Sequence, residues 1–557
     1  MINNRSKARQ STSDIDRLYV SMRHLFNRGV YRPSGQSGLM IKNLLLQLNP
    51  EIYGSIADPE KVELSGLMYV LDRLPDGITE TSYIHFTSNE GVDFTKFRPI
   101  IPPKRRRICY RVDESQMNIE VTRGRSEVYD TLTHLTFLYN EADKIRVKAY
   151  NKQTQKVNRI WRKIEDIALG DHKLTTQERD VALMHLSSVL GRSFNETQIA
   201  YKYFSTEDDK NRFFKIIYWM GQTSQMEHSG EKRREITFSP ILRERIGHHI
   251  IGETWANTIK KTLTDKGLMG RPLHIISANM HSVSNMLYSF DALKKDFATL
   301  NEFDIYKDIS SIKSSELRNA IFDFSQKNGL TFIADSSGTN MDVQIIDLKK
   351  TNLKNTAFSV LEKDVDDVLI VMDYAFGEQA FEVMDELLKP YKTKDSSVYM
   401  NVKSISIMGK AGILDGKKGD IMIPNSHIIE GPTDNYIFEN ELKASDFKGS
   451  RLGISEGPMI TVLGTSLQNR VLLEYFKESS WKAIGLDMEG GHYQKAIQIA
   501  SKIRNHIDPD VKVMYAYYAS DNPLETGSTL ASGGLGLTGV KPTYLITKMI
   551  LKKILGV

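Results

Sequence analysis

The feature that most constrains the fold is a regular alternation of apolar strands with amphipathic helices over residues 271–557. Short apolar runs such as LHIISANM, KSISIMGK and KVMYAYYASD are separated by stretches with helical periodicity, such as HSVSNMLYSFDALKKDF. Strands that alternate with helices indicate βαβ units, in which crossover helices join parallel strands. We therefore predict an α/β domain with a largely parallel sheet over residues 271–557.

Ligands of such sheets bind where the strands end at their carboxyl edge. The sequence places a carboxylate there, Glu489, between the strand AIGL and a helix that starts in GGHYQKAIQIA. A carboxylate can accept two hydrogen bonds side by side, as a vicinal diol would offer, and Met488 supplies an apolar surface for a sugar. Gly490 and Gly491 would let such hydroxyls approach closely. The alternative is that the carboxylate of Glu489 only caps the following helix.

A second carboxylate, Asp521, ends the strand MYAYYASD beside aromatic side chains. Partial loss of hydration would raise its pKa and let it hold a proton near neutrality, as a general acid for a departing heterocycle requires. The alternative is that Ser520 to Pro523 form only a turn. The glycine-rich stretch LETGSTLASGGLGLTG that follows is predicted to be a mobile flap over a ligand.

The segment GKAGILDGKKGDIMIP is predicted to be a strand end, a glycine turn and a short return strand. Gly409 and Gly412 would allow backbone N–H groups to face an anion or a sugar oxygen. Lys410 between them is a candidate phosphate contact.

Residues 1–265 are predicted to form a mainly helical domain with a small mixed insertion, in a regulatory or assembly role. The run PPKRRR is expected to be a solvated face; its alternative is a contact to a nucleotide phosphate or nucleic acid. The basic stretch lacks the regular aromatic side chains of a single-strand binder, which makes nucleic acid an unlikely partner. The loop RPSGQSG has the composition of an anion-binding loop and of any exposed loop.

Length, charge and cysteine content limit the number of domains, the kind of ligand and the cellular compartment. A length of 557 residues predicts two or three domains, and a net charge of +5 suggests anionic ligands without requiring nucleic acid. The single cysteine, Cys109, excludes an internal disulfide and fits a reducing compartment, so we expect a cytoplasmic protein. Apolar runs of roughly 20 residues, the length that spans a bilayer, are absent from the sequence, and we expect no membrane association.

Five motifs in order make residues 271–557 similar to the purine nucleoside phosphorylase and nucleosidase superfamily. They are LHIISANM, LIVMDYAFGEQAFEVMDELLKP, GKAGIL followed by GDIMIP, LDMEGG, and the pair Ser520-Asp521. The resemblance implies a three-layer α/β fold and cleavage of an N-glycosidic bond. It implies that Glu489 clamps the ribose diol, Met488 lines the sugar, and Asp521 protonates the purine at N7.

Within this superfamily the organisation is most similar to AMP nucleosidase, which also has a large N-terminal domain. The first strand is followed by Asn279 and His281, where methylthioadenosine nucleosidases carry a glutamate, and Lys410 stands where AMP nucleosidase has a basic residue. His281 would position water or, as His⁺, contact a phosphate. Arg470 is a second candidate anion contact. Two further departures from the family pattern are Ile413 for a glycine and Gly491 for an alanine.

The resemblance thus implies hydrolysis of a purine nucleoside or nucleotide, with AMP as the first candidate, in a homo-oligomer without cofactor or metal. Two alternatives stay open. A nucleoside phosphorylase would require inorganic phosphate, and a catalytically silent nucleotide sensor would bind without turnover.

Overall fold

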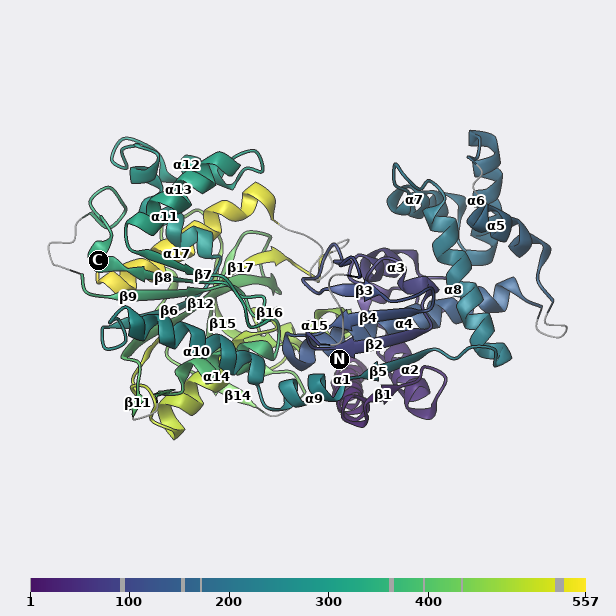
Figure 1. Cartoon of the computed structure of the whole chain (residues 1–557), viewed down its shortest axis with the longest axis horizontal. Helices are drawn as coiled ribbons and strands as arrows, with labels where there is room; N and C mark the ends of the chain where they lie inside the picture. Colours follow the sequence, from purple (N-terminus) through teal and green to yellow (C-terminus); the bar gives the residue numbers. More distant parts are fainter. Residues whose placement is uncertain are drawn as a thin grey trace. The chain divides into compact units, whose positions relative to one another are not determined.

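The computed structural model describes residues 2–90, 96–151, 156–170, 173–359, 365–393, 396–431, 434–525 and 535–557. The chain divides into two compact units (Figure 1). Unit 1 comprises Met1–His248 and Ser466–Asn469, and unit 2 comprises His249–Thr465 and Arg470–Val557.

The boundary between the units lies one helix earlier than the sequence suggests. Helix α10 (Ile250–Asp265), which we expected in the N-terminal domain, belongs to unit 2. Its Trp255 and Ile259 are buried in the same core as strand residue Ile275. The indole N–H of Trp255 also donates to the carbonyl of Met341 at 2.9 Å. The apolar face of this helix therefore needs the second sheet for its burial, which periodicity within the helix cannot reveal.

Unit 2 is built on a ten-stranded sheet in its described part. The order is β14-β13-β15-β16-β12-β6-β9-β8-β7, and β17 pairs with both β12 and β13. The strands are β6 (Leu273–Ser277), β7 (Leu330–Ile333), β8 (Val343–Asp347), β9 (Val368–Met372), β12 (Val402–Ile413), β13 (Ile421–Ile429), β14 (Asn435–Ile437), β15 (Ile454–Thr461), β16 (Gly485–Asp487) and β17 (Lys512–Asp521). A separate small hairpin joins β10 (Tyr391–Lys392) and β11 (Ser397–Val398).

Helices cover both faces of this sheet, giving three layers (Figure 1). Neighbouring strand residues alternate between two apolar cores: Ile275 lies in one and Ile276 in the other, as do Ile370 and Val371. Strands buried on both faces are the mark of parallel α/β sheets. The predicted three-layer α/β fold is confirmed. The other helices of unit 2 are α11 (Met280–Ala292), α12 (Glu302–Ser310), α13 (Ser315–Lys327), α14 (Gln379–Leu388), α15 (Arg470–Glu478), α16 (Gly490–Gln498) and α17 (Val540–Leu555).

Unit 1 contains many helices, as predicted, but also a five-stranded sheet of order β1-β5-β2-β4-β3 in its described part. The strands are β1 (Val30–Tyr31), β2 (Tyr83–Thr87), β3 (Cys109–Arg111), β4 (Gln116–Glu120) and β5 (Glu235–Phe238). The helices are α1 (Ile2–Arg28), α2 (Gln36–Leu48), α3 (Leu64–Leu71), α4 (Gly124–Ala149), α5 (Arg159–Leu169), α6 (Thr176–Leu190), α7 (Phe194–Phe204), α8 (Arg212–Ser229) and α9 (Pro240–Gly247). The mixed part is thus larger than a local insertion, because β1 and β5 join it from distant parts of the chain.

The basic run before β3 is only in part the solvated face that we expected, because Lys104 and Arg106 are exposed whereas Arg105 and Arg107 are not. Arg105 forms a two-pronged ion pair with Asp130 on α4, with distances of 2.9 Å from Nε and 2.8 Å from Nη2. Arg107 has a fully buried side chain and donates from Nη2 to the same carboxylate at 2.8 Å. Two of the four cations therefore anchor this segment to α4.

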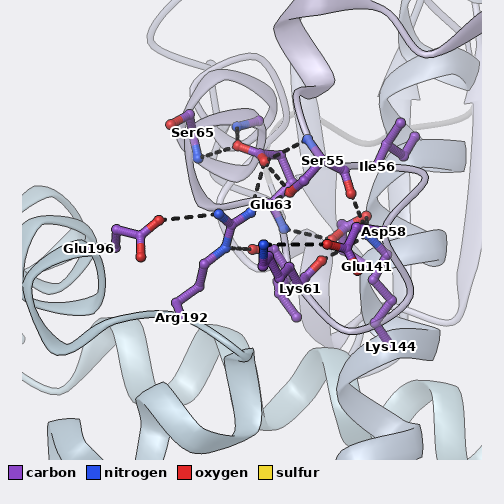
Figure 2. A network of polar contacts seen from close by, with 12 residues as sticks. Ser55, Ile56, Asp58, Lys61, Glu63, Ser65, Glu141, Lys144, Arg192 and Glu196 are labelled. Carbon is purple, nitrogen blue, oxygen red and sulfur yellow. Dashed lines mark hydrogen bonds and ion pairs between the residues drawn. The ribbon is translucent and has the colours of Figure 1, made fainter.

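A polar network fixes the loop before α3 (Figure 2). The Glu63 carboxylate accepts hydrogen bonds from the hydroxyl of Ser55 at 2.6 Å, from the N–H of Ser65 at 3.0 Å and from Nη2 of Arg192 at 2.9 Å. Below it, Lys144 pairs with Glu141 at 2.9 Å. Because each of these buried charges has several protein partners, we interpret the network as one that stabilises the fold and not as a ligand site.

Candidate active site

Strands β6 and β16 both pair with β12, run in opposite directions, and end close to each other beside it. Strand β6 runs parallel to β12 up to the pair Ile407↔Ser277, whereas β16 runs antiparallel and begins at the pair Ile413↔Gly485. Among the described strands, Met408 to Ala411 pair only with β17. The carboxyl ends of β6 and β16 therefore converge on this stretch of β12.

Glu489 follows β16, at the junction with α16. Its Oε1 accepts a hydrogen bond of 2.9 Å from the N–H of Gly377, in the loop after β9. Burial and the nearby Asp487 raise the pKa of Glu489 to about 7, although the Gly377 N–H and the charge of Lys410 act to lower it. Glu489 is half-buried, as is Met488 beside it. The carboxyl group is thus poised between its two protonation states near neutrality.

Asp521 reaches β12 from the opposite edge, where it pairs in register with Gly412. Burial raises the pKa of Asp521 above its usual range, against the opposing effects of Ser520, Lys410 and Lys418. The hydroxyl of Ser520 contacts Asp521 Oδ1 and also lies 3.2 Å from the carbonyl oxygen of Ala411. Oδ2 is buried and has no hydrogen-bond partner among the described residues. A protonated Asp521 would therefore present an unused donor.

Lys410 links the two carboxyl groups electrostatically. Its positive charge lowers the pKa of both Glu489 and Asp521, so both lie within its electrostatic reach. Two acids far apart in sequence thus flank one lysine on the central strand. Both acids lie at the carboxyl ends of strands next to β12; that they bind one ligand stays a prediction.

Lys410 also lines a cavity of about 420 Å³ together with Asn279, His281 and Arg318. Arg318 comes from α13 and is anchored by hydrogen bonds to the carbonyls of Ile309 and Ser311. Partial loss of hydration and the charge of Arg318 lower the pKa of His281, with Asp373 opposing them. Two permanent cations and a histidine favour an anion in this cavity.

The glycines after β16 are needed for the protein's own packing, a role that the sequence did not indicate. A Cβ on Gly490 would lie 2.2 Å from both His427 Cε1 and Asp487 Oδ2. A Cβ on Gly491 would lie 2.9 Å from Ile429 Cγ1 and 3.0 Å from the Thr461 hydroxyl, which accounts for the departure from alanine there.

The capping role that we considered for Glu489 belongs to Asp487. Its Oδ2 accepts a hydrogen bond of 3.0 Å from the N–H of Gly490, and its Oδ1 accepts one of 2.6 Å from Thr461. No side-chain cap hydrogen bond from Glu489 to α16 is found in the described structure. The carboxylate of Glu489 is therefore not used to start the helix.

The predicted order of strand, glycine turn and return strand is found, because β12 ends at Ile413 and β13 begins at Ile421, but Gly409 and Gly412 lie before the turn. Both glycines lie within the strand, and a Cβ on Gly409 would meet Tyr374 at 3.6 Å, an ordinary contact. Neither glycine ends the strand. The register shift between Ala411 and Gly412 marks an irregularity within β12.

Two other predictions have different outcomes. Arg470 pairs with Glu474 on its own helix at 2.9 Å and is not among the described residues that line the cavity. The predicted flap falls largely on residues 526–534, outside the described residues. The sequence gave no signal for Arg318, which lines the cavity from α13, and did not single out Gly377 within the motif LIVMDYAFGEQAFEVMDELLKP as a contact of Glu489.

Among the described residues, no group of three or more histidine, cysteine or acidic side chains is placed to hold a metal ion. In the same part of the chain, every helix is too short or too polar to cross a bilayer.

Several solved structures are similar to half of the chain. The 5′-methylthioadenosine/S-adenosyl homocysteine nucleosidase of Campylobacter jejuni is 11% identical, with a TM-score of 0.32 over 52% of this chain and 100% of that chain. A futalosine hydrolase mutant of Helicobacter pylori is 10% identical, with a TM-score of 0.29 over 51% and 99%. Isoform 2 of uridine phosphorylase from Schistosoma mansoni is 12% identical, with a TM-score of 0.32 over 54% and 92%. Likeness at this level does not bear on activity.

A family model described as "Family of unknown function (DUF6909)" matches residues 40–304 and 306–556. No protein with a curated description matches the sequence.

Proposed function

The chain belongs to the family of unknown function DUF6909, and we propose that its second unit cleaves the N-glycosidic bond of a purine nucleoside or nucleotide. One observation carries the proposal: Glu489 and Asp521 flank the same stretch of β12, each with a raised pKa and each under the charge of Lys410. In this proposal one acid binds the sugar of the ligand and the other its base.

Asp521 is the proposed general acid. As the bond between C1′ and the purine nitrogen breaks, its electron pair moves onto the base, and the proton of Asp521 passes to N7. The raised pKa favours the protonated form, and the unpartnered Oδ2 is the free donor position. Proton transfer to a leaving group of this kind accelerates cleavage roughly 10²–10⁴-fold. Ser520, in contact with Oδ1, would fix which oxygen carries the proton.

Glu489 is the proposed ribose ligand. Oε1 accepts a hydrogen bond from the Gly377 N–H, which orients the carboxylate, and the group would accept hydrogen bonds from the 2′- and 3′-hydroxyls. Two hydroxyl donors would also stabilise the charged form that burial disfavours. Met488 would contact the sugar face.

The nucleophile is proposed to be water, which attacks C1′ of the cationic sugar, loses one proton to solvent and gives the free ribose hydroxyl. His281 and Asn279 lie in the adjacent cavity, and the lowered pKa of His281 favours a neutral ring that can orient water. Lys410 and Arg318 in that cavity support a phosphate-bearing substrate such as AMP. The same cations would suit inorganic phosphate, so phosphorolysis is the alternative. No other cofactor is required by this scheme.

The test is incubation of the full chain with a panel of purine and pyrimidine nucleosides and their 5′-monophosphates, with and without inorganic phosphate. Chromatography would measure the released base and the sugar product. We expect free purine and ribose 5-phosphate from a purine monophosphate in phosphate-free buffer. Release that requires phosphate and gives a sugar 1-phosphate would instead establish a phosphorylase. Binding without any release would establish a nucleotide sensor.

We also propose that the protein is a homo-oligomer in the cytoplasm. Light scattering coupled to gel filtration tests the first part, and a purely monomeric mass at micromolar concentration would contradict it.

A further inference from the structure

We propose that unit 1 carries a second binding site, for a small phosphate-bearing molecule, in the cavity enclosed by the loop before α2 and by helices α2, α4 and α8. The cavity has a volume of about 290 Å³. Ser34 and Gly38 line it from the start of α2, Asp143 and Arg146 from α4, and Glu227 from α8. It contains part of the loop RPSGQSG, whose composition suits anion binding.

The amino end of α2 faces this cavity. The helix is 13 residues long and begins after Gly35, which provides no side chain to cap the first backbone N–H groups. These groups and the helix dipole together favour an anion at this end. The preceding loop folds tightly over the first turn, because a Cβ on Gly38 would lie 2.2 Å from the carbonyl oxygen of Arg32. The glycine therefore holds the uncapped turn beside the loop and its Ser34 hydroxyl.

A buried arginine gives an independent indication of a ligand. Arg234 lines the cavity and is 4% exposed, and its Nη1 has no hydrogen-bond partner among the described residues. The rest of its guanidinium is used: Nε donates to Glu227 at 2.6 Å, and the group lies 4.6 Å above the ring of Tyr139. A buried, unused guanidinium N–H costs free energy unless a ligand accepts from it.

The charges of the lining leave an excess of one positive charge. Lys42, Arg146 and Arg234 face two carboxylates, Asp143 and Glu227. Both carboxylates are already paired, Asp143 with Lys42 at 2.7 Å and Glu227 with Arg234 at 2.6 Å. A phosphate would therefore pair with Arg146 and not with an uncompensated carboxylate, while Arg234 keeps Glu227 and Asp143 as its own partners.

The rest of the lining limits the size and shape of the ligand. The rings of Tyr31 and Tyr139 and the side chain of Leu39 form an apolar part of the wall. A volume of about 290 Å³ lies at the small end of ligand pockets and suits a phosphorylated sugar or a similarly compact metabolite. A nucleic-acid strand does not fit a cavity of this volume.

The test uses the full chain and ribose 5-phosphate as the probe, at constant ionic strength set with sodium chloride. Calorimetry measures affinity, and hydrogen exchange of peptides covering residues 32–42 locates the site. We expect the probe to slow exchange in the first turn of α2. Arg146→Gln and Ser34→Ala should each weaken this effect about tenfold, the loss expected for one hydrogen bond to a charged group. Arg162→Gln removes the same charge from an exposed position on α5 and should leave the effect of the probe on hydrogen exchange unchanged.

Lys410→Gln separates this site from the cavity in unit 2. Protection of residues 32–42 should persist in this variant, whatever happens to catalysis. Loss of protection in Lys410→Gln, or equal weakening by Arg162→Gln and Arg146→Gln, would overturn the proposal. So would the absence of protection in the unmodified protein at millimolar ribose 5-phosphate.

Discussion

At the scale of single residues, the environment of Asp521 decides whether the site can act as an acid. Aromatic neighbours in MYAYYASD predicted that burial would raise its pKa, and this direction is confirmed. The unpartnered Oδ2 was not predictable, because it depends on where Ser520 and Ala411 meet across two strands.

Asp521→Asn should abolish most turnover while leaving binding intact. The amide keeps the shape of the side chain but cannot transfer a proton, so we expect kcat to fall roughly 10²–10⁴-fold. The substrate dissociation constant should change less than about threefold, a shift of under 1 kcal/mol. Asp510→Asn, the same change at a side chain that is 96% exposed, is the matched control. Undiminished base release by Asp521→Asn would refute the assigned acid.

Glu489 makes stability depend on pH in a definite direction. Its pKa is raised from 4.5 to about 7 in the folded protein, so the folded state holds this proton more tightly than the unfolded state does. The stabilising contribution of protonated Glu489 is complete below pH 4.5 and is lost as pH rises through 7.

Glu489→Gln should therefore be more stable than the unmodified protein at pH 8, by about 1–3 kcal/mol, and nearly equal to it at pH 4.5. Thermal unfolding at both values measures the difference. Glu439→Gln, at an exposed position of the same unit, should show no such divergence. A stability gap of the same size at both pH values would mean that burial does not raise the pKa of Glu489.

At the scale of elements, the junction of β16 and α16 shows what the sequence could and could not reveal. The strand, the acid and the helix were predicted from apolar runs and helical spacing. The antiparallel direction of β16 and the contact of Gly490 with His427 were not, because both depend on β12 and β13, which lie far away in the chain. The same holds for Arg105 and Arg107, whose partner Asp130 stands on α4.

Gly490→Ala should destabilise unit 2, because the new methyl group would overlap the buried ring of His427 and the carboxylate of Asp487. Overpacking of this kind costs about 1–3 kcal/mol. Denaturant unfolding measures the change, and Gly270→Ala is the control, since a Cβ there meets nothing within 4 Å. Equal stability of the two variants would show that the junction is loosely packed.

At the scale of the whole molecule, the basic charge of the chain is a poor guide to its partners. The net charge of +5 and the run PPKRRR allowed a nucleic-acid hypothesis, but Arg105 and Arg107 of that run are committed to Asp130. A nucleic-acid site needs cations that are free to release counterions from phosphates.

We therefore expect the full chain to bind a labelled 20-nucleotide single strand more weakly than about 10 μM at physiological salt, in the range of non-specific binding. Fluorescence anisotropy across a salt series measures this affinity. Submicromolar binding that weakens steeply with salt would contradict the assignment of the basic run to the protein's own core.

The position of Lys410 between two acids has a consequence for how the site would respond to its own substrate. An anionic group resting against this ammonium would mask the field that keeps protons off both neighbours. A nucleotide phosphate bound there would thereby raise the pKa of Asp521 and favour the protonated acid that the purine requires. A charged substrate would then activate the site, whereas a neutral analogue would not.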